Sequence, residues 1–243
     1  MSLPTFFGCL LTAYGPSLVL FFAYLARNAQ LVLLVVSSAF FWLISILLSS
    51  VLWFAIVPAR QLHPLTIAYS VLLQELFRWL LFVLINRAEA WLNLVAKNPK
   101  SLYNRAEFSF ACGYGFGLMN ALVNYSSLLA VSIGPGTVMC RSCSFASLFI
   151  ISAINVSFFV LLHIVWMMLA FEGFSGPRRS YVRIGWVILS HFVASYVTLL
   201  NSSEVNLGCI YVILVHVVLF AVSCGMVGRS LNLLHKKTLA VGS

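Results

Sequence analysis

Long runs of apolar residues, separated by short polar stretches, follow one another along the whole chain. Each run is long enough for an α-helix to cross a hydrocarbon layer about 30 Å thick. Hydrophobic residues make up 62% of the chain and charged residues 8%, whereas about a quarter of an ordinary soluble domain is charged. The pattern therefore predicts an all-α membrane protein, a bundle of seven transmembrane helices over approximately residues 3–26, 31–57, 65–85, 108–133, 145–171, 182–200 and 205–227.

The polar stretches between these runs are too short to form separate domains. The longest, from Asn86 to Glu107, is too small and too polar to enclose a hydrophobic core of its own. The first run has no basic segment before it and exceeds the apolar part of a secretory signal peptide, so we expect it to stay as a helix. We therefore expect one transmembrane domain over residues 1–243.

The positive charges of the chain lie mostly on one side of the predicted bundle. The loops on the other side hold only Arg60 and Arg141, and Arg78 lies inside a helix. Because Lys and Arg favour cytoplasmic loops, we expect an extracytoplasmic N-terminus and a cytoplasmic C-terminus. The net charge of +9 suits the anionic cytoplasmic leaflet, so we expect the lipid bilayer, and no nucleic acid, as its partner. The residues on the cytoplasmic side are Arg27, Arg87, Lys97, Lys100, Arg105, Arg178, Arg179, Arg183, Arg229, Lys236 and Lys237.

Ionisable side chains inside the predicted helices are costly and need an explanation. They are Glu75, Arg78, His163, His191 and His216. Glu75 and Arg78 are three residues apart, so they share a helix face where they can pair, and Gln74 adds an amide beside them. We favour a buried structural pair that fixes helix register over a polar functional site at the bundle centre.

Metal binding and catalysis by this chain are not expected. Three histidines on three successive helices could converge on zinc, but a single intramembrane histidine is more often a hydrogen-bonding group between helices. The chain has no Asp, and among its five Glu residues only Glu75 lies deep within a predicted helix. An aspartyl dyad is therefore excluded, and we expect no metal and no cofactor.

The fourth apolar run carries a pattern typical of close helix packing. Gly113, Gly117 and Ala121 recur every four residues and line one helix face, on a helix that also carries Asn120 and Asn124. Such a strip lets another helix approach closely. Whether that helix belongs to this chain or to another subunit is left open by the sequence.

A cysteine pair and one sequon lie in the predicted extracytoplasmic loops, where modification is one alternative. Cys140-x-x-Cys143 lies in the fourth loop, where a tight disulfide is one alternative, although we favour free thiols. The remaining cysteines fall in apolar runs and are interpreted as small hydrophobic residues. Asn201-Ser202-Ser203 is a glycosylation sequon close to the predicted membrane surface. The remaining cysteines are Cys9, Cys112, Cys209 and Cys224.

A set of short strings, in order along nearly the whole chain, resembles the anterior-pharynx-defective (Aph) family, the seven-span subunit of gamma-secretase. The most specific string is Val71-Leu72-Leu73-Gln74-Glu75-x-Phe77-Arg78. The others are Phe6-Phe7-Gly8-Cys9, Tyr14-Gly15-Pro16, Ala39-Phe40-Phe41-Trp42-Leu43, the step from Gly113 to Gly117, Gly134-Pro135-Gly136-Thr137, Leu161-Leu162-His163-x-x-Trp166, and Ser190-His191.

The resemblance implies a scaffold that binds nicastrin, presenilin and the presenilin enhancer. Their complex cleaves type I membrane proteins such as Notch and the amyloid precursor, and presenilin supplies its catalytic aspartates. The family resides in the endoplasmic reticulum and Golgi and, once assembled, in the plasma membrane or endosomes. Its helix-packing glycines correspond to Gly113 and Gly117 and its intramembrane histidines to His163 and His191. The chain departs from the family pattern in four places. They are Ala121, where the family usually has Gly, a shortened second loop, His216, and the Cys140/Cys143 pair.

A rival hypothesis is a glutamate-type intramembrane protease that trims prenylated proteins. Glu75 with Arg78, Phe159-x-x-x-His163 and His191 faintly resemble that class, in which Glu and His activate a water molecule. Its paired glutamates are here Gln74-Glu75, so one base remains. We interpret this as an ancestral site that has become structural, with residual proteolysis as the alternative. A receptor or transporter has only the helix count in its favour.

Overall fold

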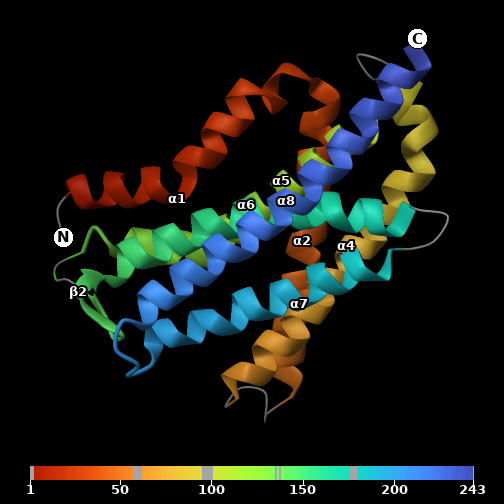
Figure 1. Ribbon diagram of the computed structural model, residues 1–243. Helices are drawn as coiled ribbons and strands as arrows, with labels where there is room; N and C mark the ends of the chain where they lie inside the picture. The colour runs from red at the N-terminus through yellow and green to blue at the C-terminus, as the bar shows by residue number, and fades with distance from the viewer. Residues whose placement is uncertain are drawn as a thin grey trace.

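The fold consists of long helices joined by short connections, together with one small hairpin (Figure 1). The computed structural model describes residues 3–56, 62–94, 101–134, 136, 138–175 and 180–242. The elements in chain order are α1 (Leu3–Ala23), η1 (Leu25–Arg27), α2 (Ala29–Ala55), α4 (His63–Leu94), α5 (Asn104–Val131), β1 (Met139–Cys140), β2 (Cys143–Ser147), α6 (Leu148–Ser175), α7 (Tyr181–Val197), η2 (Thr198–Ser202) and α8 (Gly208–Gly242).

The expected class, an all-α membrane protein, is confirmed. Within the described residues, six helices are long and apolar enough to cross a membrane: α1 with η1, α2, α4, α6, α7 with η2, and α8. The helix α5, predicted as a seventh span over 108–133, is not among them. Asn120 and Asn124 lower its apolar character, and half of its 28 residues are buried between neighbouring helices. A helix so enclosed needs less apolar surface than one that faces lipid.

Several helices extend beyond the predicted spans, because polar residues do not by themselves end a helix. The helix α4 continues to Leu94 and α8 to Gly242, well beyond the apolar runs that end at 85 and 227. In the opposite sense, the run that begins at 145 starts as the strand β2, and α6 begins only at Leu148. Asn28 caps α2, since its side-chain oxygen accepts a hydrogen bond from the backbone N–H of Gln30.

The helix α5 lies between α2 and α6, and α6 also contacts α1, α7 and α8. This arrangement puts α5 and α6 at the centre of the bundle, with Phe108, Phe116, Trp42 and Phe149 in the shared hydrophobic core. The N-terminal end of α1 and the hairpin lie at one end of the molecule, and the C-terminal end of α8 lies at the other (Figure 1).

The structure places the predicted small-residue strip against another helix of the same chain. A Cβ atom on Gly113 would lie 2.7 Å from the Ile164 Cα, and one on Gly117 would lie 2.9 Å from the Val160 backbone oxygen, both on α6. Ala121, on the same face of α5, is buried. The sequence left open whether the approaching helix belongs to this chain or to another subunit. For these two glycines it is α6 of the same chain.

Gly115, which lies off that strip, makes a second close helix contact. A Cβ atom there would lie 2.1 Å from the Val35 backbone oxygen and 2.3 Å from the Ser38 Oγ of α2. No real Cβ atom tolerates such distances. Glycine is therefore required on two faces of α5, and the repeat of small residues every four positions predicts only one of them.

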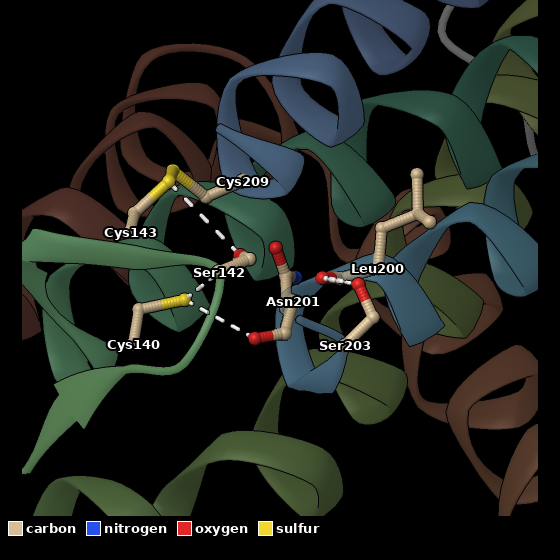
Figure 2. Close-up of a disulfide and its surroundings, with 7 residues drawn as sticks. All are labelled: Cys140, Ser142, Cys143, Leu200, Asn201, Ser203 and Cys209. Carbon is tan, nitrogen blue, oxygen red and sulfur yellow. Dashed lines mark hydrogen bonds between the residues drawn. A yellow bond between two sulfur atoms is a disulfide. The ribbon is translucent and has the colours of Figure 1, made fainter. Parts of the chain in front are cut away.

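The disulfide differs from both sequence alternatives. Cys143 is bonded to Cys209, with a Cα–Cα distance of 6.1 Å, and Cys140 remains a buried thiol (Figure 2). The prediction of free thiols at this hairpin was wrong for Cys143, and the interpretation of Cys209 as a small hydrophobic residue was also wrong. Pairing across 66 residues depends on tertiary structure, which brings the first turn of α8 to the hairpin.

Candidate functional site

The intramembrane polar residues, with the exception of His216, form one buried cluster between four helices. Glu75 and Arg78 of α4 make the ion pair that their spacing predicts, with 3.1 Å from Arg78 Nε to Glu75 Oε2 and from Arg78 Nη2 to Glu75 Oε1. The Arg78 side chain is fully buried, and 11% of the Glu75 side chain is exposed. The Phe116 ring lies 5.1 Å from Arg78 Cζ and adds a cation–π contact. The paired arrangement is what allows two charges to be buried in the bundle.

His163 of α6 joins this pair to α5. Its Nδ1 lies 3.2 Å from Arg78 Nη2, and its Nε2 lies 2.7 Å from Asn120 Nδ2. A guanidinium group can only donate hydrogen bonds, so Nδ1 accepts and the ring of neutral His163 carries its proton on Nε2. The Asn120 amide group contacts the ring at this second nitrogen. His163 therefore bridges α4 and α5 from its place on α6.

His191 of α7 completes the cluster from the other side. Its Nδ1 lies 2.7 Å from Glu75 Oε1, so a protonated Nδ1 donates to the carboxylate. The His191 ring also packs on Trp166, with 4.8 Å between ring centroids, and against His163 at 5.2 Å. One carboxylate thus receives hydrogen bonds from two helices, α4 and α7.

Gln74 extends the polar network to a further helix. Its Oε1 accepts a hydrogen bond of 3.1 Å from the Trp42 Nε1–H of α2. Both side chains are buried, so the bond pairs a donor and an acceptor that would otherwise have no partner in the apolar interior. Together, the contacts of Gln74, Glu75 and Arg78 connect α4 to α2, α6 and α7, and His163 carries the network on to α5.

A pocket opens from this cluster toward the hairpin end of the bundle. Its volume is about 380 Å³. Gln74, Asn120 and His191 line its inner end, and Thr198 and Asn201 line its outer end. Many of its other lining groups are polar and come from α4 and α6: Thr66, Ser70, Ser152 and Asn155. Among the described residues, the Oδ1 atoms of Asn155 and Asn201 are buried with no hydrogen-bond partner, so the pocket suits bound water.

The zinc alternative finds no support in this geometry. His163 and His191 are neighbours, but His216 lies apart, where its Nε2 is 3.3 Å from the Ala194 backbone oxygen and its ring packs against Phe159. Within the described ranges, no group of three or more His, Cys, Asp or Glu side chains is placed to hold a metal ion.

The arrangement also bears on whether Glu75 can act as a base. Its Oε1 is within hydrogen-bond distance of Arg78 Nη2 and of His191 Nδ1, and its Oε2 is within that distance of Arg78 Nε. A general base needs a free lone pair within reach of a water molecule. These contacts join α4 to α7 through the Glu75 carboxylate.

Sequence reasoning missed two members of this cluster. Trp42 is a largely apolar residue on a different helix from Gln74. Its indole N–H is the one group that requires a hydrogen-bond partner when buried. Asn120 was noted for its polarity but not as the partner of His163. A signal was available in both cases, because a buried indole N–H and a buried amide each require a partner.

Comparison with known proteins places this chain among close relatives. Residues 4–230 match the sequence profile described as Aph-1 protein. Gamma-secretase subunit Aph-1 of Drosophila melanogaster is 33% identical over 204 residues, 84% of each chain. Gamma-secretase subunit APH-1B of Homo sapiens is 31% identical over 226 residues, 88% of this chain and 86% of its own. Gamma-secretase subunit APH1-like of Arabidopsis thaliana is 33% identical over 212 residues, 84% of this chain and 83% of its own. The similarity covers every helix that contributes to the polar cluster.

Proposed function

The chain belongs to the Aph-1 family, and on this premise we propose that it is the non-catalytic scaffold subunit of gamma-secretase. Relatives in an insect, a mammal and a plant are all named as subunits of that complex. The observation that carries the proposal is the match over residues 4–230, nearly the full chain. The scaffold stabilises presenilin, nicastrin and the presenilin enhancer, whose complex cleaves type I membrane proteins such as Notch and the amyloid precursor.

The absence of catalysis in this subunit is supported by the polar cluster. A chain without Asp cannot supply an aspartyl dyad. The rival hypothesis of a glutamate-type protease is supported neither by the names of the relatives nor by Glu75, whose oxygens face Arg78 and His191. The catalytic aspartates of the complex then lie in presenilin.

For the topology, we propose seven spans, with α5 as the enclosed seventh. Its 28 residues are enough to cross the hydrocarbon layer. The N-terminus is extracytoplasmic and the C-terminus cytoplasmic, and the bias of Lys and Arg toward one side supports this orientation. Five of these basic residues lie outside the described residues: Arg60, Lys97, Lys100, Arg178 and Arg179. The Cys143–Cys209 disulfide gives separate support, because disulfides persist in oxidising compartments and this one lies at the hairpin end, with the N-terminus.

The glycines of α5 support assembly through the fold of this chain. Gly113 and Gly117 set the approach of α5 to α6, and α6 carries His163 into the cluster. The chain passes through the endoplasmic reticulum and Golgi and, once assembled, reaches the plasma membrane or endosomes. The surfaces that partners contact are then the outer faces of the bundle rather than the strip itself.

Purification of the tagged full-length chain from native membranes in mild detergent tests this proposal. We expect presenilin, nicastrin and the presenilin enhancer to co-purify with it. The variant Gly117→Leu is expected to lose these partners, because a leucine side chain has no room beside the Val160 backbone. Gly225→Leu is the matched control for the folding of the isolated chain, since nothing lies within 4 Å of a Cβ at that position of α8.

The thermal stability of each variant, measured on the isolated chain, separates a folding defect from a lost contact. A Gly117→Leu chain that is as stable as the parent and keeps its partners would contradict the packing role of the strip. A parent chain recovered without any protease subunit would contradict the proposed function.

The pocket and the topology together predict the labelling of an engineered cysteine. Ser195 lines the pocket, so Ser195→Cys is expected to react with a membrane-impermeant maleimide added outside intact cells, above the background of the parent chain. Ser45→Cys, at a fully buried position, is the control and is expected to stay unlabelled. Labelling only after permeabilisation would reverse the proposed orientation, and no labelling in either case would mean that the pocket is dry.

A further inference from the structure

Three cysteines from three segments of the chain gather at the hairpin end of the bundle. Cys140 ends β1, Cys143 begins β2, and Cys209 lies in the first turn of α8. Cys143 and Cys209 form the disulfide, whereas Cys140 is a thiol, and these three side chains pack with Ile151 in one small core. From this arrangement we propose an intramolecular thiol–disulfide exchange site. In the exchange, Cys140 replaces Cys209 as the disulfide partner of Cys143, and α8 is released from the hairpin.

The hairpin gives Cys140 and Cys143 the geometry of an alternative pair. They are directly opposite one another in the antiparallel ladder, across a two-residue turn of Arg141 and Ser142. Residues directly opposite in such a ladder have side chains on the same face, with Cβ atoms about 4.5–5.5 Å apart, close to the spacing that a disulfide spans. Cys143 can therefore pair with either of two partners.

Contacts of the Cys140 thiol hold it beside the disulfide without joining it. Its Sγ donates to the Asn201 backbone oxygen at 3.3 Å and lies 3.5 Å from Ser142 Oγ. The same Ser142 hydroxyl lies 4.0 Å from Cys143 Sγ, so it stands between the thiol and the disulfide, as Figure 2 shows. A rotation of the Cys140 side chain away from Asn201 is the movement that brings the two sulfur atoms together.

Burial favours exchange within the chain over reaction with an outside thiol. Cys140 and Cys209 are 1% exposed and Cys143 is 2% exposed. Exchange requires access to the sulfur that is attacked, and here the thiol with access is the one already inside the cluster. The same burial keeps Cys140 from reaction with external oxidants, so it persists as a thiol in an oxidising compartment.

The exchange step needs no oxidant or reductant. The Cys140 thiolate attacks Cys143 Sγ, the bond from Cys143 to Cys209 breaks, and a bond from Cys140 to Cys143 forms. Cys209 leaves as a thiolate and takes up a proton equivalent to the one that Cys140 has lost. The chain contains one disulfide and one thiol in this cluster both before and after the step.

The segment that the disulfide ties down is under backbone strain, which gives the exchange a structural consequence. Leu207 has a φ of 59°, and it is the single non-glycine residue with positive φ in the described part of the chain. Its N–H donates to the Ser142 backbone oxygen at 3.0 Å, which fixes it beside the hairpin. A bulky residue in this conformation persists only where its surroundings hold it. Release of Cys209 frees this junction, and the departure of Cys140 frees Asn201 at the outer end of the pocket.

A time course on the purified full-length chain tests the proposal. The oxidised protein is held at pH 8.5 with no added thiol, quenched with acid, alkylated, and analysed by peptide mass spectrometry at each cysteine. We expect alkylated Cys209 to rise to roughly 0.1–10% of chains, the range of a minor conformational state, with an equal loss of alkylated Cys140. In Cys140→Ser, Cys209 is expected to stay unalkylated.

A second variant tests the alternative pair directly. Cys209→Ser is expected to contain a Cys140–Cys143 disulfide when isolated from membranes under non-reducing conditions. Wild-type Cys209 that is alkylated no more than in Cys140→Ser would overturn the proposal, and so would Cys209→Ser with both remaining hairpin cysteines alkylated. Both measurements follow the chain alone, so their failure leaves the role in gamma-secretase untouched.

Discussion

Replacing Arg78 with alanine is expected to lower the free energy of unfolding by about 3–5 kcal/mol, the cost of leaving one partner of a buried ion pair uncompensated. Arg78 is fully buried and binds Glu75 through two nitrogen atoms, and its Nη2 also contacts His163. The variant strands the Glu75 carboxylate, with only His191 left as its partner in the cluster. The measurement is heating of the detergent-solubilised chain followed by size-exclusion chromatography of the folded fraction.

A double variant separates the charge from the shape of the side chain. Glu75→Gln with Arg78→Gln removes both charges, and it is expected to be more stable than Arg78→Gln alone, because no unpaired ion remains. Arg141→Ala is the matched surface control. Arg141 pairs with Glu204 at 2.6 Å, but the two side chains are 66% and 83% exposed, so its loss is expected to cost less than about 1 kcal/mol. A double variant no more stable than Arg78→Gln would contradict the ion-pair explanation.

The contacts that the sequence predicted are local ones. Glu75 and Arg78 are three residues apart on one helix, and helical geometry alone places them together. That His163 and His191 meet this pair depends on how α6 and α7 are rotated and how deep they sit, which the packing of the whole bundle decides. The same holds for Trp42 and Gln74, which lie 32 residues apart on two helices.

The disulfide shows the same limit from another side. The short spacing of Cys140-x-x-Cys143 suggests a local pair, but the partner of Cys143 is 66 residues away. The pattern along the chain holds no sign that α8 begins beside the hairpin. For α5, composition alone is a poor guide. A helix surrounded by others can carry Asn120 and Asn124 at little cost, so its hydropathy says less about its place than its burial does.

Gly115→Ala is expected to destabilise the protein by about 3 kcal/mol, the upper end of the usual cost of overpacking a core. The added methyl group would lie 2.1 Å from the Val35 backbone oxygen and 2.8 Å from the Val35 carbonyl carbon. Main-chain atoms cannot rotate away as a side chain does, so α2 and α5 must separate along their contact. Trp42 of the same helix α2 donates to Gln74, so α2 links the glycine contact to the polar cluster.

The comparison with the neighbouring glycines makes this a test of geometry. At Gly113 and Gly117 the nearest atoms would lie 2.7 and 2.9 Å from an added Cβ, so alanine there requires a smaller shift of α6. The expected order of thermal stability is therefore Gly225→Ala, at least as stable as the parent because alanine favours the helix, then Gly117→Ala, with Gly115→Ala lowest. If Gly115→Ala were as stable as Gly117→Ala, α2 and α5 would not be in the close contact described. The requirement for glycine on α5 would then rest on its contact with α6 alone, the face that the repeat of small residues every four positions already predicts.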